Sequence, residues 1–227
     1  MNKNNNCIIG LHRGEIIKKK NIINCGIFIK NIIDNIKLDA KPKIMIKLNI
    51  KDLYTLIFIG NCGIGTKTSL INAYLEGKGC GQKCFLATLR SDPTFKKIQY
   101  LQKNLELRLI DTCGQERYSR YLFFHHNVDC IILGYDITDY DSFKNIESFW
   151  IPIAKNNNKC KKFYLVGNKI DLEEERKVSK EEAIKLANKY GFPFCEVSAK
   201  YYINVKELFE DILNYIIFNE SKFLYNN

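Results

Sequence analysis

The feature that most constrains the fold is a series of short apolar runs, each followed by a polar or glycine-rich turn. The first run, 53–59, is rich in β-forming side chains, as expected of a strand buried on both faces of a parallel sheet. Similar runs follow at 105–110, 128–135, 162–166 and 192–197, and helical patterns lie between them at 67–76, 141–155, 179–190 and 203–218. This alternation predicts an α/β fold with a doubly wound, mostly parallel sheet flanked by helices. A ligand is then expected at the carboxyl ends of the strands.

Local signals support one of these helices in particular. Ser179 is followed three residues later by Glu182, which is the pattern of a capping box at a helix start. Gly191 stands where the glycine that ends such a helix is expected.

Composition separates the first fifty residues from the rest. Ile, Lys and Asn make up 32 of residues 1–50, which carry a net charge of +7 out of +10 for the whole chain. The other 177 residues carry only +3, so a nucleic-acid partner is not expected. We predict a low-complexity basic extension at 1–50, a folded domain at 51–218 and a short tail at 219–227.

Three interpretations of the basic arm stay open. It could dock peripherally on anionic lipid, to which each Lys or Arg near the surface adds about 1 kcal/mol. It could equally be a compositionally biased extension without a role, or the native chain could start at Met45.

The nine scattered cysteines without a secretory leader, and the lack of an apolar run of about 18 residues, predict a cytoplasmic protein with reduced thiols.

The turn after the first run has the chemistry of a phosphate site. Residues 60–71 form a glycine-rich turn that opens a helix, where backbone N–H groups, a Lys and a hydroxyl can meet phosphates and Mg²⁺. The spacing G-x-x-x-x-G-K-[ST] is missed by one residue, because Thr66 stands where the Lys is expected. We interpret this as a one-residue insertion. The predicted phosphate-binding residues here are Gly60, Asn61, Cys62, Gly63, Ile64, Gly65, Thr66, Lys67, Thr68 and Ser69.

Three other strand ends carry polar motifs. Asp111 can hold Mg²⁺ through water, and the N–H of Gly114 can sense a γ-phosphate. The predicted metal ligands so far are Asp111 and the Thr68 hydroxyl of the loop. The Asp171 carboxylate can accept two hydrogen bonds from guanine, a donor pair that adenine lacks, and the segment 198–200 can close over the same base. The predicted guanine-binding group is Asn168, Lys169, Asp171, Ser198, Ala199 and Lys200.

In these motifs the chain resembles the small GTPases of the Ras superfamily, and most of all the Rab branch. The most specific stretches are 111–118, 134–143, 167–171 and 196–200, and the resemblance covers roughly 52–218. It implies that 51–218 is a Ras-like P-loop GTPase domain. It also implies a molecular switch that binds GTP and GDP, hydrolyses GTP with Mg²⁺ as cofactor and acts in intracellular vesicle trafficking.

The resemblance also assigns roles to individual residues. Gln115 would orient the attacking water as the catalytic residue. The switch threonine, which binds Mg²⁺ and the phosphate when GTP is present, normally lies 23 residues before the Asp, and that count gives Thr88. Thr94 is the alternative, because it follows a proline as the family's threonine does. Exchange factors, activating proteins and effectors would bind the switch segments at about 77–96 and 114–126.

Departures from the family pattern limit what carries over. Residues 89–93 read Leu-Arg-Ser-Asp-Pro in place of Ile-Gly-Val-Asp-Phe, so effector identity is not implied. The last thirty residues contain no Cys, so prenylation of the usual type is not expected. We expect a cytoplasmic monomer whose contact with endomembranes is peripheral, without a prenyl anchor.

The altered loop leaves a second function open. A non-catalytic pseudo-GTPase would keep the fold as an interaction module and bind nucleotide weakly. Losing one charge-assisted hydrogen bond of about 1.5–3 kcal/mol weakens binding roughly 10- to 150-fold. The base-reading and Gln motifs favour GTP chemistry, and the motif 168–171 speaks against an ATPase or a P-loop kinase.

Overall fold

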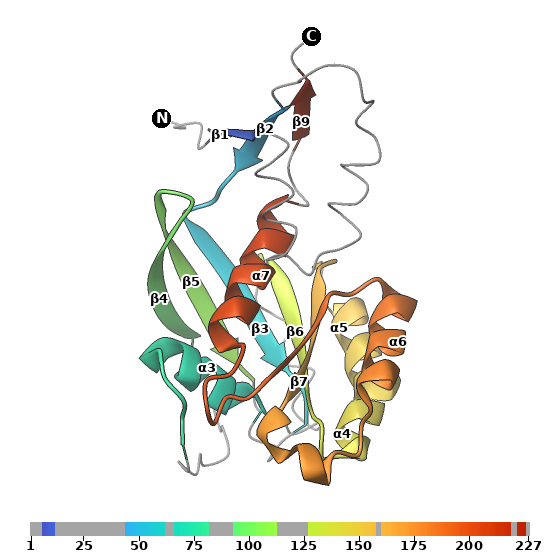
Figure 1. Ribbon diagram of the computed structural model, residues 1–227. Helices are drawn as coiled ribbons and strands as arrows, with labels where there is room; N and C mark the ends of the chain where they lie inside the picture. The colour runs from blue at the N-terminus through green and yellow to red at the C-terminus, as the bar shows by residue number, and fades with distance from the viewer. Residues whose placement is uncertain are drawn as a thin grey trace. The chain divides into compact units, whose positions relative to one another are not determined.

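The computed structural model describes residues 6–11, 44–61, 66–81, 93–112, 127–157, 160–218 and 222–225. The contacts divide the chain into two compact units, one formed by Met1–Lys51 with Glu210–Asn227 and the other by Asp52–Phe209. In the described part of the first unit, three antiparallel strands pair in the order β1 (Asn6–Leu11), β2 (Ile44–Asn49), β9 (Lys222–Tyr225) (Figure 1). The segments expected to be an extension and a tail thus contribute strands.

The second unit is built on a six-stranded sheet in the order β4-β5-β3-β6-β7-β8 (Figure 1). Its strands are β3 (Leu53–Ile59), β4 (Pro93–Tyr100), β5 (Lys103–Asp111), β6 (Cys130–Asp136), β7 (Phe163–Asn168) and β8 (Phe194–Val197). Strand β4 runs antiparallel to β5, and every other pair is parallel. The sheet grows from β3 in both directions, which confirms the doubly wound α/β fold.

Helices follow these strands at the places that the sequence predicts. They are α3 (Thr66–Glu76), α4 (Tyr140–Asn145), the π-helix η2 (Ile146–Trp150), α5 (Ile151–Asn157), α6 (Lys180–Tyr190) and α7 (Val205–Phe218). Ser179 caps α6 through a complete capping box, and Gly191 ends it in a left-handed conformation, as predicted. Three elements of this unit have no counterpart in the sequence pattern: the π-helical turn, the edge strand β4 and the 3-10 helix η3 (Ile170–Glu175).

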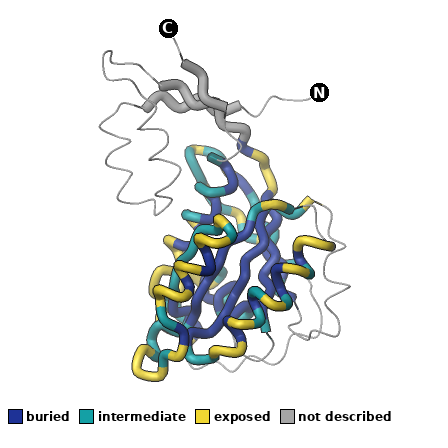
Figure 2. Tube along the Cα trace, turned by 90° about the vertical axis from the view of Figure 1, so that its right-hand side faces the viewer, coloured by how far each residue is buried: buried dark blue, intermediate teal, exposed yellow. Residues whose placement is uncertain are grey.

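Both faces of the sheet are covered, so its central strands are buried except for Leu53 at the start of β3 (Figure 2). One face carries a continuous apolar cluster in which strand residues such as Ile57 and Leu133 pack with Trp150 and with Leu186 of α6. The alternate residues face the other way, where the ring of Phe58 lies 6.0 Å from that of Phe209 at the start of α7. The strand ends are therefore held by a packed core on both sides.

Within the described residues, no helix combines the length and the apolar character that a membrane span requires.

Candidate functional site

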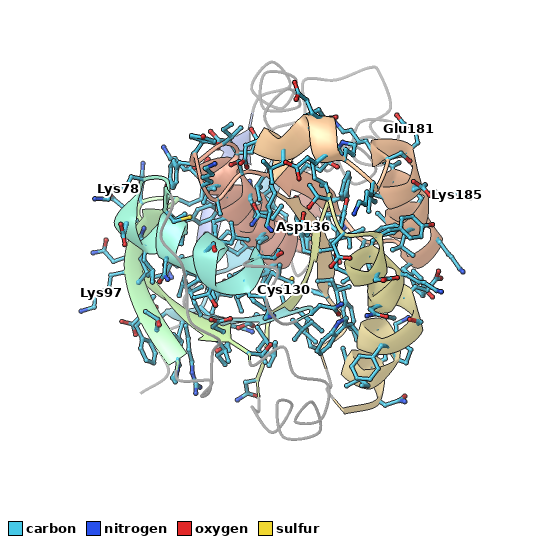
Figure 3. All side chains as sticks on the ribbon, turned by 90° about the horizontal axis from the view of Figure 1, so that it is seen from below. Lys78, Lys97, Cys130, Asp136, Glu181 and Lys185 are labelled. Carbon is cyan, nitrogen blue, oxygen red and sulfur yellow. The ribbon has the colours of Figure 1, made fainter. Side chains whose placement is uncertain are left out.

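The parallel register brings the four predicted motifs to one edge of the sheet. Asp111 pairs with Phe58 two residues before Gly60, and Asn168 pairs with both Asp136 and Val197. The carboxyl ends of β3, β5, β6, β7 and β8 therefore meet at the lower edge of the second unit in Figure 1. Figure 3 looks onto this edge, and Asp136 at the end of β6 lies near the middle of the view.

Lys67 reaches back from the first turn of α3 to the start of the glycine-rich loop. Its ammonium group donates hydrogen bonds to the carbonyl oxygens of Gly60 and Asn61, each at 2.8 Å. The residue is 7% exposed, so the charge is held over the loop and largely away from solvent. The extra residue has not moved the lysine away from the loop. Cys62, Gly63, Ile64 and Gly65 lie outside the described residues.

Two glycines make room for this loop. A Cβ on Gly60, whose φ is +151°, would lie 2.2 Å from the carbonyl oxygen of Gly134 in β6. A Cβ on Gly134 would lie 2.9 Å from the methyl group of Thr66, the residue that breaks the motif's spacing. Thr66 is 1% exposed, so its methyl group fills the space that Gly134 leaves open.

Thr68 and Asp111 present two oxygen ligands side by side. The hydroxyl of Thr68 donates to one carboxylate oxygen of Asp111 at 2.5 Å. Hydroxyl and carboxylate oxygens are the ligands that Mg²⁺ prefers, so this pair fits such an ion. In the part of the chain that the structure describes, no group of three or more His, Cys, Asp or Glu side chains could hold a metal ion. The pair therefore suits an ion that takes its other ligands from phosphate and water.

The two predicted guanine motifs are bonded to each other. The side-chain oxygen of Asn168 accepts from the backbone N–H groups of Lys169 at 2.8 Å and Ala199 at 3.0 Å. The hydroxyl of Ser198 donates to Asp171 at 2.6 Å, and the ammonium of Lys200 lies 4.0 Å from the other oxygen of that carboxylate. The segment 198–200 is thus fixed to the end of β7. The structure brings all six predicted residues together.

Asp136 is a residue of this edge to which the sequence analysis gave no role. Its carboxylate is 4% exposed and forms an ion pair with Lys169 at 2.6 Å, while its other oxygen accepts from Thr138. Lys169 itself has a left-handed backbone (φ 73°). The signal for Asp136 in the sequence is its place directly after the predicted strand at 128–135.

The chain that follows α3 is also tied to the base-reading segment. The backbone N–H groups of Cys80 and Gly81 donate to the carbonyl oxygens of Ala199 and Lys200, both at 3.1 Å. A Cβ on Gly79 would lie 2.2 Å from the carbonyl oxygen of Lys200, so this approach requires glycine. No sequence motif marks these contacts, because they are made by backbone atoms.

Comparison with known proteins gives the family. The model of the Ras family matches residues 55–218. The chain belongs to the Ras family of small GTPases. Its relatives include Ras-related protein Rab-13 of Canis lupus familiaris, 37% identical over 166 residues that cover 73% of this chain and 80% of the relative. Others are the Ypt/Rab-type GTPase ypt7 of Schizosaccharomyces pombe (37% identity, 71% and 81% covered) and Ras-related protein SEC4 of Candida albicans (35%, 71% and 76%).

This small GTPase is therefore of the Rab type, a GTP-binding switch that hydrolyses GTP to GDP and acts in vesicle trafficking. The pseudo-GTPase alternative is not supported over this function. It rested on a displaced lysine, whereas Lys67 contacts the first two carbonyls of the loop.

Several predicted site residues of the GTPase are not described by the structure. Gln115, Gly114 and Thr88 lie outside the described residues. Thr94, the alternative switch threonine, lies on β4 opposite Leu109 and is exposed. The choice between the two threonines stays a prediction.

Proposed function

We propose that this GTPase binds GTP and GDP with Mg²⁺ through an intact phosphate loop, in spite of the extra residue. The observation that carries the proposal is the pair of hydrogen bonds from Lys67 to the carbonyls of Gly60 and Asn61. They hold a positive charge over the loop from the helix side, at the place where a lysine meets the terminal phosphates. The N-terminus of α3 adds its partial positive charge at the same point.

The proposed phosphate site combines the loop with the start of the helix. Its residues are Gly60, Asn61, Cys62, Gly63, Ile64, Gly65, Thr66, Lys67, Thr68 and Ser69, with Thr88 and Gly114 added when GTP is present. The bound Mg²⁺ would be held by Thr68, Asp111 and, with GTP, Thr88, and it would neutralise charge on the phosphates. The adjacent oxygens of Thr68 and Asp111 support this assignment.

Guanine is the base that this site would select. The carboxylate of Asp171 can accept hydrogen bonds from two neighbouring donors of guanine. The hydroxyl of Ser198 donates to one oxygen of this carboxylate at 2.6 Å and so orients it. Asn168 organises the site, because it bonds the backbone of the segment 198–200 to the end of β7. Lys169 and Lys200 line the site through their ion pairs with Asp136 and Asp171.

Hydrolysis would depend on Gln115, which would orient water toward the γ-phosphate. Without a partner we expect slow turnover, on the order of 10⁻⁴ per second, because an activating protein usually supplies the missing arginine. Exchange factors, activating proteins and effectors would bind the switch segments 77–96 and 114–126 of a monomer. In the cell the protein would be cytoplasmic, with peripheral endomembrane contact through its basic arm and no nucleic-acid partner.

The proposal is tested by replacing the lysine that carries it. In Lys67→Met the charge-assisted hydrogen bond to the phosphate is lost. One such bond is worth about 1.5–3 kcal/mol, so we expect GDP to bind roughly 10- to 150-fold more weakly. Lys185→Met is the matched control, because Lys185 is exposed on α6 (Figure 3) and should leave affinity unchanged. Equal GDP affinity for Lys67→Met and the wild type, measured by equilibrium titration, would contradict the proposal.

A further inference from the structure

The helix after β6 contains one turn that is wider than an α-helical turn. In η2 the backbone N–H of Ile151 donates to the carbonyl of Ile146, five residues earlier rather than four. A π-helical turn thus holds one residue more than an α-helical turn, and such turns occur frequently at functional sites. The additional residue in this helical turn changes which side chains the following helix presents to its neighbours.

Trp150, the last residue of this turn, contacts the phosphate loop. Its side chain is fully buried, and its indole N–H donates to the side-chain oxygen of Asn61 at 2.9 Å. The amide nitrogen of Asn145, just before the turn, lies 3.4 Å from the same oxygen. Donors from both ends of the π-helical turn therefore converge on one residue of the loop.

Asn61 connects this contact to the nucleotide site. Its backbone carbonyl accepts from the Lys67 ammonium at 2.8 Å, while its side-chain oxygen accepts from Trp150. Asn61 is thus held from the α3 side and from the η2 side at once. Thr66, at the other end of the loop, is fixed against Gly134.

We propose that Trp150 is a positioning residue for nucleotide binding. The π-helical turn sets the indole against Asn61, and this hydrogen bond holds the start of the phosphate loop where Lys67 reaches it despite the extra residue. The inference rests on the nucleotide site proposed above and adds a residue that lies outside its sequence motifs. Trp150 would act on the nucleotide site through its hydrogen bond to Asn61.

Conservative substitution separates this role from core packing, because Trp150 also belongs to the apolar cluster. Trp150→Phe keeps an aromatic ring and removes the N–H donor. Losing one buried hydrogen bond predicts a roughly fivefold to tenfold faster dissociation of radiolabelled GDP from the full chain with Mg²⁺. The matched control is Ser148→Ala in the same turn, since Ser148 is exposed and its hydroxyl donates to the carbonyl of Lys144 in its own helix. We expect its dissociation rate to be unchanged.

A double-mutant cycle tests whether the indole acts through Asn61. Asn61→Ala removes the acceptor, so adding Trp150→Phe to it should speed GDP dissociation little further. Additive effects of the two substitutions would overturn the proposal. Far-UV circular dichroism establishes that each variant is folded.

Trp150 is the single tryptophan of the chain, so its emission reports on this contact directly. Removing GDP with a chelator should change the emission at the same rate at which radiolabelled GDP leaves. An indole that only packs the core would give the same emission with and without nucleotide. That result, or a dissociation rate of Trp150→Phe equal to the wild type, overturns the inference. A wild type that binds no GDP would instead overturn the proposed function.

Discussion

Gly134→Ala tests how the chain accommodates the residue that breaks the phosphate-loop spacing. The added Cβ would lie 2.9 Å from the Thr66 methyl group, closer than side-chain carbons approach in folded proteins. Thr66 is 1% exposed and begins α3 directly before Lys67, so it has no free space to enter. The Cβ of the new alanine must therefore displace the first turn of α3.

The cost follows from this overpacking. Inserting one carbon into a filled interior typically costs about 1–3 kcal/mol. If the strain is relieved by shifting Thr66 and Lys67, the GDP dissociation constant should rise by roughly 5- to 150-fold. If the loop does not shift, the free energy of unfolding should instead fall by about 1–3 kcal/mol. Urea unfolding without nucleotide and an equilibrium titration with GDP measure the two quantities separately.

Thr66→Ser supplies the matched rescue. Serine keeps the hydroxyl and lacks the methyl group, and the next atoms near a Cβ on Gly134 lie at 3.7 Å, an ordinary contact. The double variant should therefore recover most of what Gly134→Ala loses. A neutral Gly134→Ala, or a double variant no better than the single one, would refute the reasoning that Thr66 occupies the space above Gly134.

Two further substitutions probe contacts outside the phosphate loop. In Gly79→Ala the new Cβ would meet the Lys200 carbonyl oxygen at 2.2 Å, so the base-reading segment must move. We expect GDP release to be at least about tenfold faster, since more than 1.4 kcal/mol of binding free energy is lost. An unchanged release rate would contradict this. In Ser179→Ala the capping box is lost, which should cost about 1 kcal/mol in urea unfolding at neutral pH. Hydrogen bonds from Ser179 hold the pKa of Glu182 below its usual value, so this contribution is present above the unfolded-state pKa and is lost as the pH falls through the folded-state pKa. The difference between variant and wild type should therefore shrink in acid, and a difference that is constant with pH would contradict it.

Much of the sheet was predictable from the sequence because buried parallel strands are short, apolar and punctuated. The run 53–59 coincides with β3, and the other four runs overlap their strands with shifts at the ends. The capping residues of α6 were equally visible, since a cap is a local interaction. Strand β4 was missed because it lies at the edge of the sheet, where its side chains are half-buried or exposed and leave no apolar run.

The site shows the same division between local and tertiary information. The motifs identified Lys67, but only the structure shows that it spans the loop to Gly60. Nothing local marks the π-helical turn, because an apolar helical pattern tolerates one extra residue. The bond from Trp150 to Asn61 joins residues 89 positions apart, so it depends on how the sheet and helices pack.

The central claim is that the extra residue leaves the phosphate loop working. The most direct measurement is calorimetric titration of the full chain with GDP, GTP and ATP, each with and without Mg²⁺. We predict tight binding of both guanine nucleotides that requires Mg²⁺ for full affinity, and no comparable binding of ATP. Absence of guanine-nucleotide binding, or binding that is indifferent to Mg²⁺, would contradict the account.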